Sequence, residues 1–366
     1  MKASALNKGF YKNKRVFVTG HTGFKGAWLN QVLSCLGATF WGYALPPEDG
    51  SLYTKTDRRF LTGETFGDTR DRENLIKAVC DFRPEIILHL AAVVTVQDCC
   101  ADPYRAFSTN IMGTVNVLEA TRFCADVKSV VVITTDKVYE NKGDNAVYKV
   151  GDALTGTDPV SASNTGAEYV LSAYKNTYLH TPGRFVGIAS ARPGNVIAGG
   201  DHVTTRLIPS ILEGFAAKKP AQIRNPDQTR SWQSVIDALN GYLTIGRKLY
   251  ESPAEFSEPW NIGPTKDGIR SVGYIYDKIR QFFNNSESYS PGQNLADMTP
   301  SVVSAVKESR TLGLDIEDSQ KKLGWQPEQT LDKILFELTD FFKRQQQHEP
   351  EQDICRRQIR EFFNIL

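Results

Sequence analysis

The sequence lacks the features that mark several specialised classes of protein. Lys and Arg number 43 against 42 Asp and Glu, so the formal net charge is +1. This balance excludes a nucleic-acid or membrane-surface partner that is recognised through bulk charge. No apolar run approaches the roughly 18 residues of a membrane helix, and no apolar signal core follows the basic segment 1–15. We therefore expect a cytoplasmic protein with no nucleic-acid and no membrane partner.

Cysteine is also scarce, with six residues in 366. A chain of this length buries a core without a disulfide or metal staple. The cysteine spacing fits no zinc motif, and the adjacent Cys99 and Cys100 do not form a CxxC pair, so we expect no metal site. Several cysteines lie in apolar segments, and we interpret the set as buried thiols. They are Cys35, Cys80, Cys99, Cys100, Cys124 and Cys355.

The first half of the chain alternates short apolar runs with helical patterns, which is typical of βαβ units. The predicted strands cover 15–19, 39–45, 64–67, 86–92, 129–135 and 186–192. The predicted helices cover 26–36, 71–82, 110–124 and 159–177. After Arg192 the rhythm changes and Gly, Pro and polar residues become denser. The fold class we predict is α/β, a Rossmann-type doubly wound parallel sheet with a smaller mixed α/β substrate lobe.

A glycine-rich loop joins the first predicted strand to the first predicted helix. Its spacing is GxxGxxG, which permits a tight turn, close approach to a pyrophosphate and close helix–sheet packing. The helix N-terminus then presents free N–H groups to the phosphates. The alternative interpretation is a plain strand–helix turn. We predict dinucleotide binding, and the cofactor residues in this loop are Gly20, His21, Gly23, Phe24, Lys25 and Gly26.

Further segments fall where a dinucleotide site requires them. Asp68 ends the third strand, where a carboxylate accepts from an adenine amino group. Small residues after the fourth strand let the backbone pass close to the cofactor, and the helix at 110 opens beside them. The end of the second strand, 42–45, holds no Asp or Glu for the ribose and no Arg pair for a 2′-phosphate, which favours NAD modestly over NADP. The additional cofactor residues are Leu90, Ala91, Ala92 and Thr109.

Together these segments resemble the extended short-chain dehydrogenase/reductase superfamily, and most closely the CDP-glucose 4,6-dehydratases. His21 with Lys25, and the pair Asp136-Lys137, are similar to the CDP-sugar branch. The likeness spans about 14–343. The matching segments are 18–26, 108–115, 134–139, 192–197, 206–209, 223–226, 232–233 and 260–264.

The resemblance implies an internal redox cycle on a nucleotide sugar with bound NAD, used in deoxysugar or surface-polysaccharide biosynthesis. In the family a Thr binds the sugar near O4, an Asp protonates the departing C6 hydroxyl and the next residue assists loss of the C5 proton. These positions are Thr135, Asp136 and Lys137. The resemblance also implies a homodimer that pairs the helices at 110–124 and 160–177. The implied contacts to the nucleotide diphosphate are Asn195, Arg206, Arg224 and Arg230.

The change of rhythm after Arg192 and the polar composition of the tail divide the chain into three parts, and the resemblance indicates what the first two bind. Residues 1–192 form mainly the NAD-binding Rossmann domain. Residues 193–343 form mainly the nucleotide-sugar lobe, with some segments that return to the sheet. Residues 344–366 begin as a polar tail, for which we expect exposure over 344–351. The stretch 354–366 reads as an amphipathic helix that packs on its own chain or on a neighbour.

One departure from the family is large. The superfamily oxidises an alcohol with a Tyr-x-x-x-Lys pair, and alignment places Val160 and Asn164 at these two positions. Each acid–base group typically contributes about 10²–10⁴-fold, so standard activity is in doubt. The candidate replacements are Ser161, Ser163, Thr135 and Tyr139.

The departure leaves two alternatives to a complete dehydratase. One is a divergent enzyme that acts on a CDP-sugar already oxidised at C4, by elimination or epimerisation. The other is a catalytically silent sugar-nucleotide-binding subunit of an active homologue. Asp98, in a second divergent segment, is a further candidate acid or base, although a solvated loop residue is the simpler interpretation. The distant Tyr274 and Lys278 also have the spacing of the pair, which ordinary helix periodicity explains.

Overall fold

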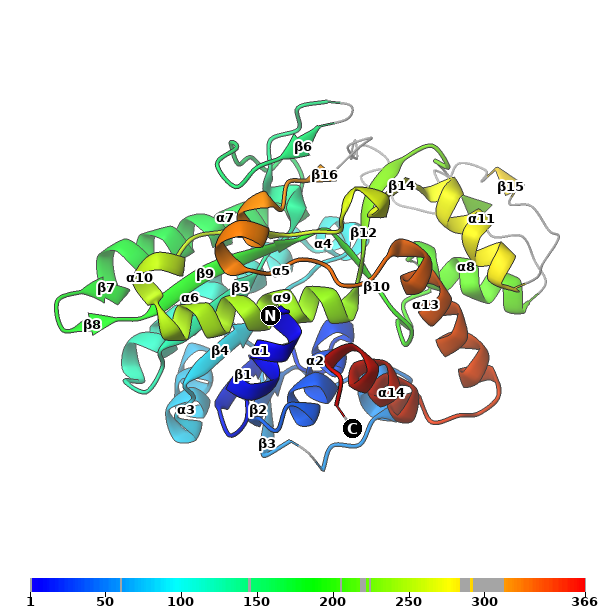
Figure 1. Ribbon diagram of the computed structural model, residues 1–366. Helices are drawn as coiled ribbons and strands as arrows, with labels where there is room; N and C mark the ends of the chain where they lie inside the picture. The colour runs from blue at the N-terminus through cyan, green and yellow to red at the C-terminus, as the bar shows by residue number, and fades with distance from the viewer. Residues whose placement is uncertain are drawn as a thin grey trace.

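The computed structural model contains a seven-stranded sheet in which all neighbouring strands are parallel (Figure 1). Their order is β13-β9-β5-β4-β1-β2-β3. This doubly wound order confirms the predicted fold class. The structure describes residues 2–59, 61–143, 146–204, 206–217, 222–223, 225–283, 290–291 and 313–365. The strands are β1 (Arg15–Thr19), β2 (Thr39–Ala44), β3 (Gly63–Phe66), β4 (Ile86–His89), β5 (Ser129–Ile133), β9 (Gly187–Pro193) and β13 (Trp260–Ile262).

Helices cover both faces of this sheet, because alternate residues of each strand point to opposite sides. Val131 of β5 belongs to one apolar core, and its neighbours Val130 and Val132 belong to the other. The first core includes α1 (Ala3–Phe10), α2 (Phe24–Cys35) and α9 (Val235–Glu251). The second includes α3 (Arg72–Phe82), α6 (Gly113–Phe123) and α7 (Pro159–Tyr174). Figure 1 shows α9 and α1 in front of the sheet.

A smaller lobe holds a third apolar core beside the sheet. Its three strands are β10 (Asn195–Ile197), β12 (Thr229–Ser234) and β14 (Ile269–Ser271). Its helices are α8 (Leu207–Ala216), α11 (Val272–Phe283) and α13 (Leu331–Gln346). The chain does not stay in this lobe, since α9 and β13 return to the large sheet.

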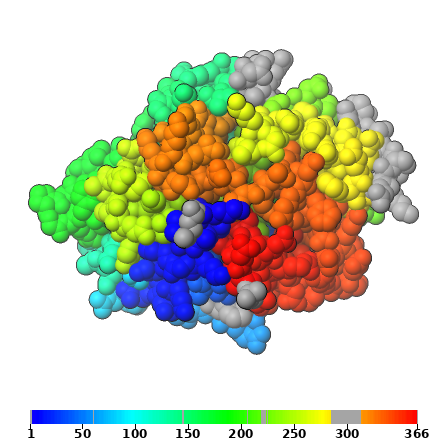
Figure 2. Space-filling view, in the orientation of Figure 1, coloured from blue at the N-terminus to red at the C-terminus, as the bar shows by residue number. Residues whose placement is uncertain are grey.

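The C-terminal helix α14 (Glu351–Phe363) packs on its own chain. Ile354, Ile359 and Phe363 are buried in the same core as α2, which decides between the two partners considered for this segment. Figure 2 shows the C-terminal segment directly beside the N-terminal one. Before α14, residues 346–348 are exposed as expected, whereas Glu351 is buried and accepts a hydrogen bond from Lys55 at 2.7 Å.

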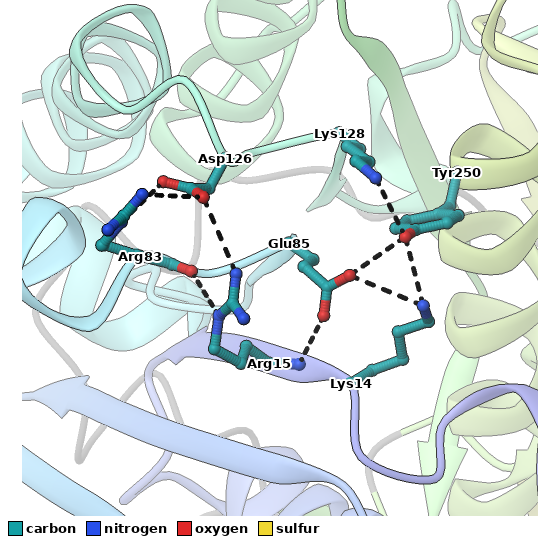
Figure 3. Close-up of polar contacts among 7 residues, drawn as sticks. All are labelled: Lys14, Arg15, Arg83, Glu85, Asp126, Lys128 and Tyr250. Carbon is teal, nitrogen blue, oxygen red and sulfur yellow. Dashed lines mark hydrogen bonds and ion pairs between the residues drawn. The ribbon is translucent and has the colours of Figure 1, made fainter.

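The amino ends of the central strands carry a polar network (Figure 3). Glu85, just before β4, accepts hydrogen bonds from the backbone N of Arg15 at 3.1 Å and from the hydroxyl of Tyr250 at 3.0 Å. The ammonium of Lys14 lies 3.5 Å from the same carboxylate. Lys128, just before β5, donates to the Tyr250 hydroxyl at 3.2 Å. These contacts tie α9 to the edge of the sheet that faces away from the glycine-rich loop.

Membrane-spanning helices, metal-binding groups and the cysteines can be compared with the predictions over the described residues. Within them, no helix has both the length and the apolar character to span a bilayer. The same residues contain no group of three or more His, Cys, Asp or Glu side chains placed to hold a metal ion. All six cysteines are free, but the interpretation of the whole set as buried thiols is wrong for three of them. Cys99, Cys124 and Cys355 are buried, whereas Cys35, Cys80 and Cys100 are half-buried.

Candidate active site

The glycine-rich loop forms a backbone cradle between β1 and α2. Gly20 has φ of +73°, and a Cβ there would lie 2.7 Å from the backbone N of Ala91. A Cβ on Gly26 would lie 2.2 Å from the carbonyl oxygen of Gly20. Neither position therefore tolerates a side chain. Gly23 is the N-cap of α2, so the free N–H groups of that helix open onto the cradle, which fits a pyrophosphate.

The segment after β4 lies against the same loop. The backbone N of Leu90 donates to the carbonyl of Thr19 at 3.1 Å, and that of Ala91 donates to the Thr19 hydroxyl at 3.3 Å. Burial lowers the pKa of the neighbouring His89 to about 4, so this imidazole is neutral. The predicted cofactor residues Leu90 and Ala91 thus lie beside Gly20, and Ala92 follows them directly. Their contact with a dinucleotide stays a prediction.

The helix predicted at 110–124 begins differently from a plain α-helix. Residues Ser108–Met112 form a π-helical turn that leads into α6. Thr109 lies half-buried in this turn. Its neighbour Asn110 holds the loop after β4, because its side-chain oxygen accepts from the backbone N of Val93 at 2.8 Å and its amide donates to the Val93 carbonyl at 3.0 Å.

Asp68 follows β3, and His21 belongs to the glycine-rich loop. The carboxylate of Asp68 is paired with Arg70 at 2.6 Å, and this hydrogen bond lowers its pKa. His21 is fully buried, and its Nε2 lies 3.1 Å from Glu64 Oε2. Its ring fills the space above Gly42, where a Cβ would lie 2.4 Å away. Sequence reasoning missed this contact between the loop residue His21 and Glu64 on β3.

The Thr135-Asp136 pair follows the carboxyl end of β5. The Thr135 hydroxyl donates to Asp136 Oδ1 at 3.1 Å, and it is half-exposed while Asp136 is buried. Burial raises the pKa of Asp136, and the positive charges of Lys137 and Arg230 partly oppose this rise. A buried carboxyl with a raised pKa retains its proton to higher pH, as a general acid requires.

The positive charges of Lys25, Lys137 and Arg230, which lie in three separate segments, act on Asp136. Burial, and to a smaller extent the charge of Arg206, lower the pKa of Lys25 to about 8, while the charge of Asp136 opposes this change. The Lys25 ammonium also lies 5.9 Å from the centre of the Tyr242 ring. The structure therefore places Lys25, which we assigned to the cofactor, in the electrostatic field of the predicted acid as well.

The smaller lobe supplies the predicted diphosphate contacts. Asn195 on β10 is paired in register with Trp232 on β12, two residues from Arg230. Arg206 precedes α8 and forms an ion pair with Asp201 at 3.0 Å. Arg224 lies outside the described residues. The charge of Arg230 acts on Asp136, and that of Arg206 acts on Lys25. The contacts of both arginines to a ligand stay a prediction.

Val160 and Asn164 lie in the first two turns of α7. Val160 is buried in a small apolar cluster with Val93, Cys99 and Ala106. The amide of Asn164 donates to the Val160 carbonyl at 2.8 Å. Asn164 therefore satisfies its helix backbone and supplies no charge, and Val160 has no proton acceptor.

Two serines of α7 are engaged by structural hydrogen bonds. Ser161 donates to the carboxylate of Asp158 at 2.6 Å in a capping box at the helix start. Ser163 is fully buried, donates to the Val160 carbonyl at 3.2 Å and accepts from Asn110 at 2.9 Å. Neither serine is placed as a free base.

Other candidates are also held in place. The Tyr139 hydroxyl donates to Asn261 at 2.5 Å and accepts from Arg192 at 3.0 Å, and burial raises its pKa. Of the four proposed replacements, Thr135 alone is half-exposed and bonded to a predicted catalytic group. Its role as a base stays a prediction.

Two remaining candidates have structural explanations. Asp98 lies in the first turn of α4 (Val96–Ala101) and accepts from the Thr95 hydroxyl at 2.5 Å, while Thr95 accepts from the Asp98 backbone N at 3.0 Å. Tyr274 and Lys278 lie on α11, where Lys278 forms an ion pair with Asp332. Both arrangements are ordinary helix contacts.

Sequence reasoning missed a second buried carboxylate near Asp136. Glu168, on α7, forms a two-point ion pair with Arg192 on β9, with distances of 2.9 and 3.0 Å. Its two oxygens also accept from the hydroxyls of Thr134 and Ser190, both at 2.7 Å. Four hydrogen bonds, three from β9 and one from Thr134 just after β5, therefore converge on one side chain.

The sheet order and the glycine cradle define a Rossmann-fold protein with a dinucleotide-type site. The chain belongs to the family described as GDP-mannose 4,6 dehydratase, whose model matches residues 17–338. It is 38% identical over 344 residues to CDP-glucose 4,6-dehydratase of Salmonella typhimurium, covering 92% of this chain and 93% of the relative. These findings confirm the resemblance drawn from the sequence, and they make the chain a CDP-glucose 4,6-dehydratase-like enzyme.

More distant proteins share the fold. The chain is 25% identical over 296 residues to dTDP-glucose 4,6-dehydratase 1 of Escherichia coli, covering 75% of this chain and 77% of the relative. An epimerase structure from Methanothermobacter thermautotrophicus superposes with a TM-score of 0.75 at 20% identity, over 94% of this chain and 96% of the other. The dTDP-glucose 4,6-dehydratase of Bacillus anthracis, solved in complex with NAD, gives 0.74 at 19% identity, over 91% and 98%.

Proposed function

We propose that this chain binds NAD and acts on a CDP-linked hexose as a 4,6-dehydratase. The observation that carries the proposal is the 38% identity over almost the whole chain to a CDP-glucose 4,6-dehydratase. The buried Asp136, with its raised pKa, supports it because loss of a hydroxyl group needs an acid.

The residues have distinct tasks in this proposal. The glycine-rich loop would hold NAD, which would supply the hydride chemistry between sugar C4 and C6. The glycine cradle binds the pyrophosphate, while Asn195, Arg206, Arg224 and Arg230 bind the substrate diphosphate, for which planar guanidinium groups are well suited. Asp136 protonates the departing C6 hydroxyl, Thr135 binds the sugar near O4, and Lys137 assists loss of the C5 proton.

A second function is favoured by one observation: Val160 packs in an apolar cluster, and Asn164 and the two α7 serines are used in structural hydrogen bonds. An enzyme that receives a CDP-sugar already oxidised at C4 needs no base for the C4 hydroxyl. Such a chain would carry out elimination or epimerisation with the same Thr135-Asp136 pair. A silent subunit that binds the nucleotide sugar without turnover is the third alternative.

One experiment separates these functions. The purified protein is incubated with NAD and either CDP-glucose or its 4-keto-6-deoxy derivative, and the products are followed by NMR. Conversion of CDP-glucose to the 4-keto-6-deoxy sugar is the expected result. Change of the 4-keto sugar alone favours the second function, and no change of either overturns both. Calorimetry tests cofactor binding separately. Absence of binding at millimolar NAD and NADP would contradict the proposal that the chain binds NAD.

The partners and setting follow from the same proposal. We propose a homodimer, and large exposed apolar side chains near α6 and α7 support it: Phe123 and Tyr169 are each 60% exposed and Met112 is 50% exposed. A monomer in light scattering at micromolar concentration would contradict it. The cytoplasm is the proposed location, and deoxysugar synthesis for lipopolysaccharide or other surface polysaccharides is the proposed use.

A further inference from the structure

The hydrogen bonds of Glu168 connect the helix α7 to the strand ends that present the predicted acid. Thr134, which donates to Glu168 Oε1 at 2.7 Å, immediately precedes Thr135 and Asp136. The backbone N of Thr134 also donates to the carbonyl of Ala191 on β9 at 2.9 Å. The position of Thr134 is therefore fixed from two sides, by its own strand neighbour and by a carboxylate on the helix.

The partner of Glu168 extends the same network to the other side of Asp136. Arg192 is 3% exposed and Glu168 is 4% exposed, measured on their side chains. Arg192 uses its remaining nitrogen to donate to the Tyr139 hydroxyl at 3.0 Å and to the Val150 carbonyl at 3.2 Å. Tyr139 follows the short helical turn Asp136–Val138 directly. The residues before and after the Thr135-Asp136 pair are thus held by one ion pair.

We propose that Glu168 is a positioning residue that fixes where Thr135 and Asp136 lie relative to the substrate, through Thr134 on one side and Arg192–Tyr139 on the other. This inference rests on the function proposed above for Asp136. Charge neutrality of the pair explains how a carboxylate is tolerated at this depth. Displacement of a reacting group by about 1 Å is enough to cost about 10²-fold in rate, so loss of the network should reduce turnover without a change of the binding surface.

The test begins with Thr134→Val and Thr134→Ser. Valine is close in size to threonine but cannot donate to Glu168, whereas serine keeps the hydroxyl. We expect Thr134→Val to lower kcat for CDP-glucose about tenfold or more, a part of the loss that a 1 Å displacement causes, with less than about twofold change in KM. Thr134→Ser should stay near the wild-type rate. Equal rates in both variants would overturn the inference.

A second pair of variants separates positioning from stability. Glu168→Gln leaves the Arg192 charge buried without its partner, and the protein should be both less stable and slower. In the double variant Glu168→Leu/Arg192→Met neither charge is buried, which typically restores stability, but the hydrogen bond to Thr134 is still absent. We expect the double variant to regain thermal stability and to stay slow. Recovery of the rate together with stability would show a merely structural role and overturn the inference.

A control variant and a readout that needs no turnover complete the design. Glu85→Gln removes a carboxylate from the opposite edge of the sheet and should leave kcat unchanged. Hydrogen exchange at the amides of 135–138 should be faster in Thr134→Val than in Thr134→Ser, whichever sugar the protein acts on. If wild-type protein fails to convert CDP-glucose, the proposed function fails while this exchange measurement still decides the inference, and equal exchange in both variants would reject it.

Discussion

Two carboxylates lie at opposite edges of the same parallel sheet, and their surroundings differ. Glu85 at the amino ends is 16% exposed on its side chain, and its ion pair with Lys14 spans 3.5 Å. Glu168 at the carboxyl ends is 4% exposed and contacts Arg192 at 2.9 Å. Solvent screens the first pair and contributes to its hydration, whereas the second depends wholly on protein partners. We therefore expect the Glu85–Lys14 pair to be replaceable at little cost in stability, and the buried Glu168–Arg192 pair to be needed for the structure around the candidate site.

The largest effect should come from the acid itself. In Asp136→Asn the amide cannot protonate a leaving hydroxyl, so any elimination by the wild type should fall about 10²–10⁴-fold. The folded protein should be at least as stable near neutral pH, because the raised pKa of Asp136 means that its ionisation opposes folding. NMR assays of product and thermal unfolding measure the two quantities. A variant with wild-type turnover would contradict the assignment of the acid.

The two ion pairs should differ when only the cation is removed. Arg192→Met leaves the Glu168 carboxylate buried and should lower the free energy of unfolding by about 3–5 kcal/mol. Lys14→Met at the other edge should cost less than about 1 kcal/mol. Urea unfolding of both variants gives the comparison. Equal losses would mean that burial does not distinguish the two edges.

Restoration of the missing redox pair, which lies at the carboxyl edge of the sheet, should raise the turnover of CDP-glucose. Val160→Tyr with Asn164→Lys should increase oxidation of CDP-glucose more than the product of the two single changes, because the groups act as a unit. The tyrosine alone should help little, since Asn164 supplies no charge for a phenolate. Steady-state rates of the four proteins test this. A wild-type rate of about 1 s⁻¹ or more, within the usual range of enzymes, would show that another residue is the base.

The smallest effect should come from Glu85→Gln. Burial alone would raise the pKa of Glu85, but the hydrogen bonds from Arg15 and Tyr250 and the charge of Lys14 lower it overall. The carboxylate therefore stabilises the fold at neutral pH, by about 1 kcal/mol for a net hydrogen bond. This contribution is lost as the pH falls through the lowered pKa. Unfolding curves of wild type and variant should converge in acid; a constant difference would contradict this origin.

The sequence allowed most of the sheet to be predicted because its central parallel strands β4, β5 and β9 are buried on both faces. Such strands are continuous apolar runs, and 129–135 is the clearest of them. The strand β13 was not predicted individually, since it has three residues and lies among Gly, Pro and polar residues. Local pattern carries little information about so short a segment, whose pairing with β9 depends on the folded sheet.

The parts of the site that are contiguous in sequence could be predicted. The parts that bring together residues distant in sequence could not. The glycine loop and the Thr135-Asp136 pair are each local. Glu64 and Glu168 bond to partners 43 and 24 residues away, so no local spacing reveals them. The available signal was an acidic residue, Glu64, within a predicted strand and another, Glu168, within a predicted helix. Exposure to solvent explains such residues equally well until the fold is known.

The packing of α14 against α2 has a consequence for synthesis of the chain. The apolar core on the side of the sheet where α2 packs also contains residues of α9, of β13 and finally of α14. During translation, the first half therefore leaves the ribosome with an apolar face that its own residues cannot cover. Contacts between the two ends of the chain close this face last, which slows folding and prolongs exposure to aggregation. A nascent chain arrested before α14 should accordingly be a client for chaperones that bind apolar surface.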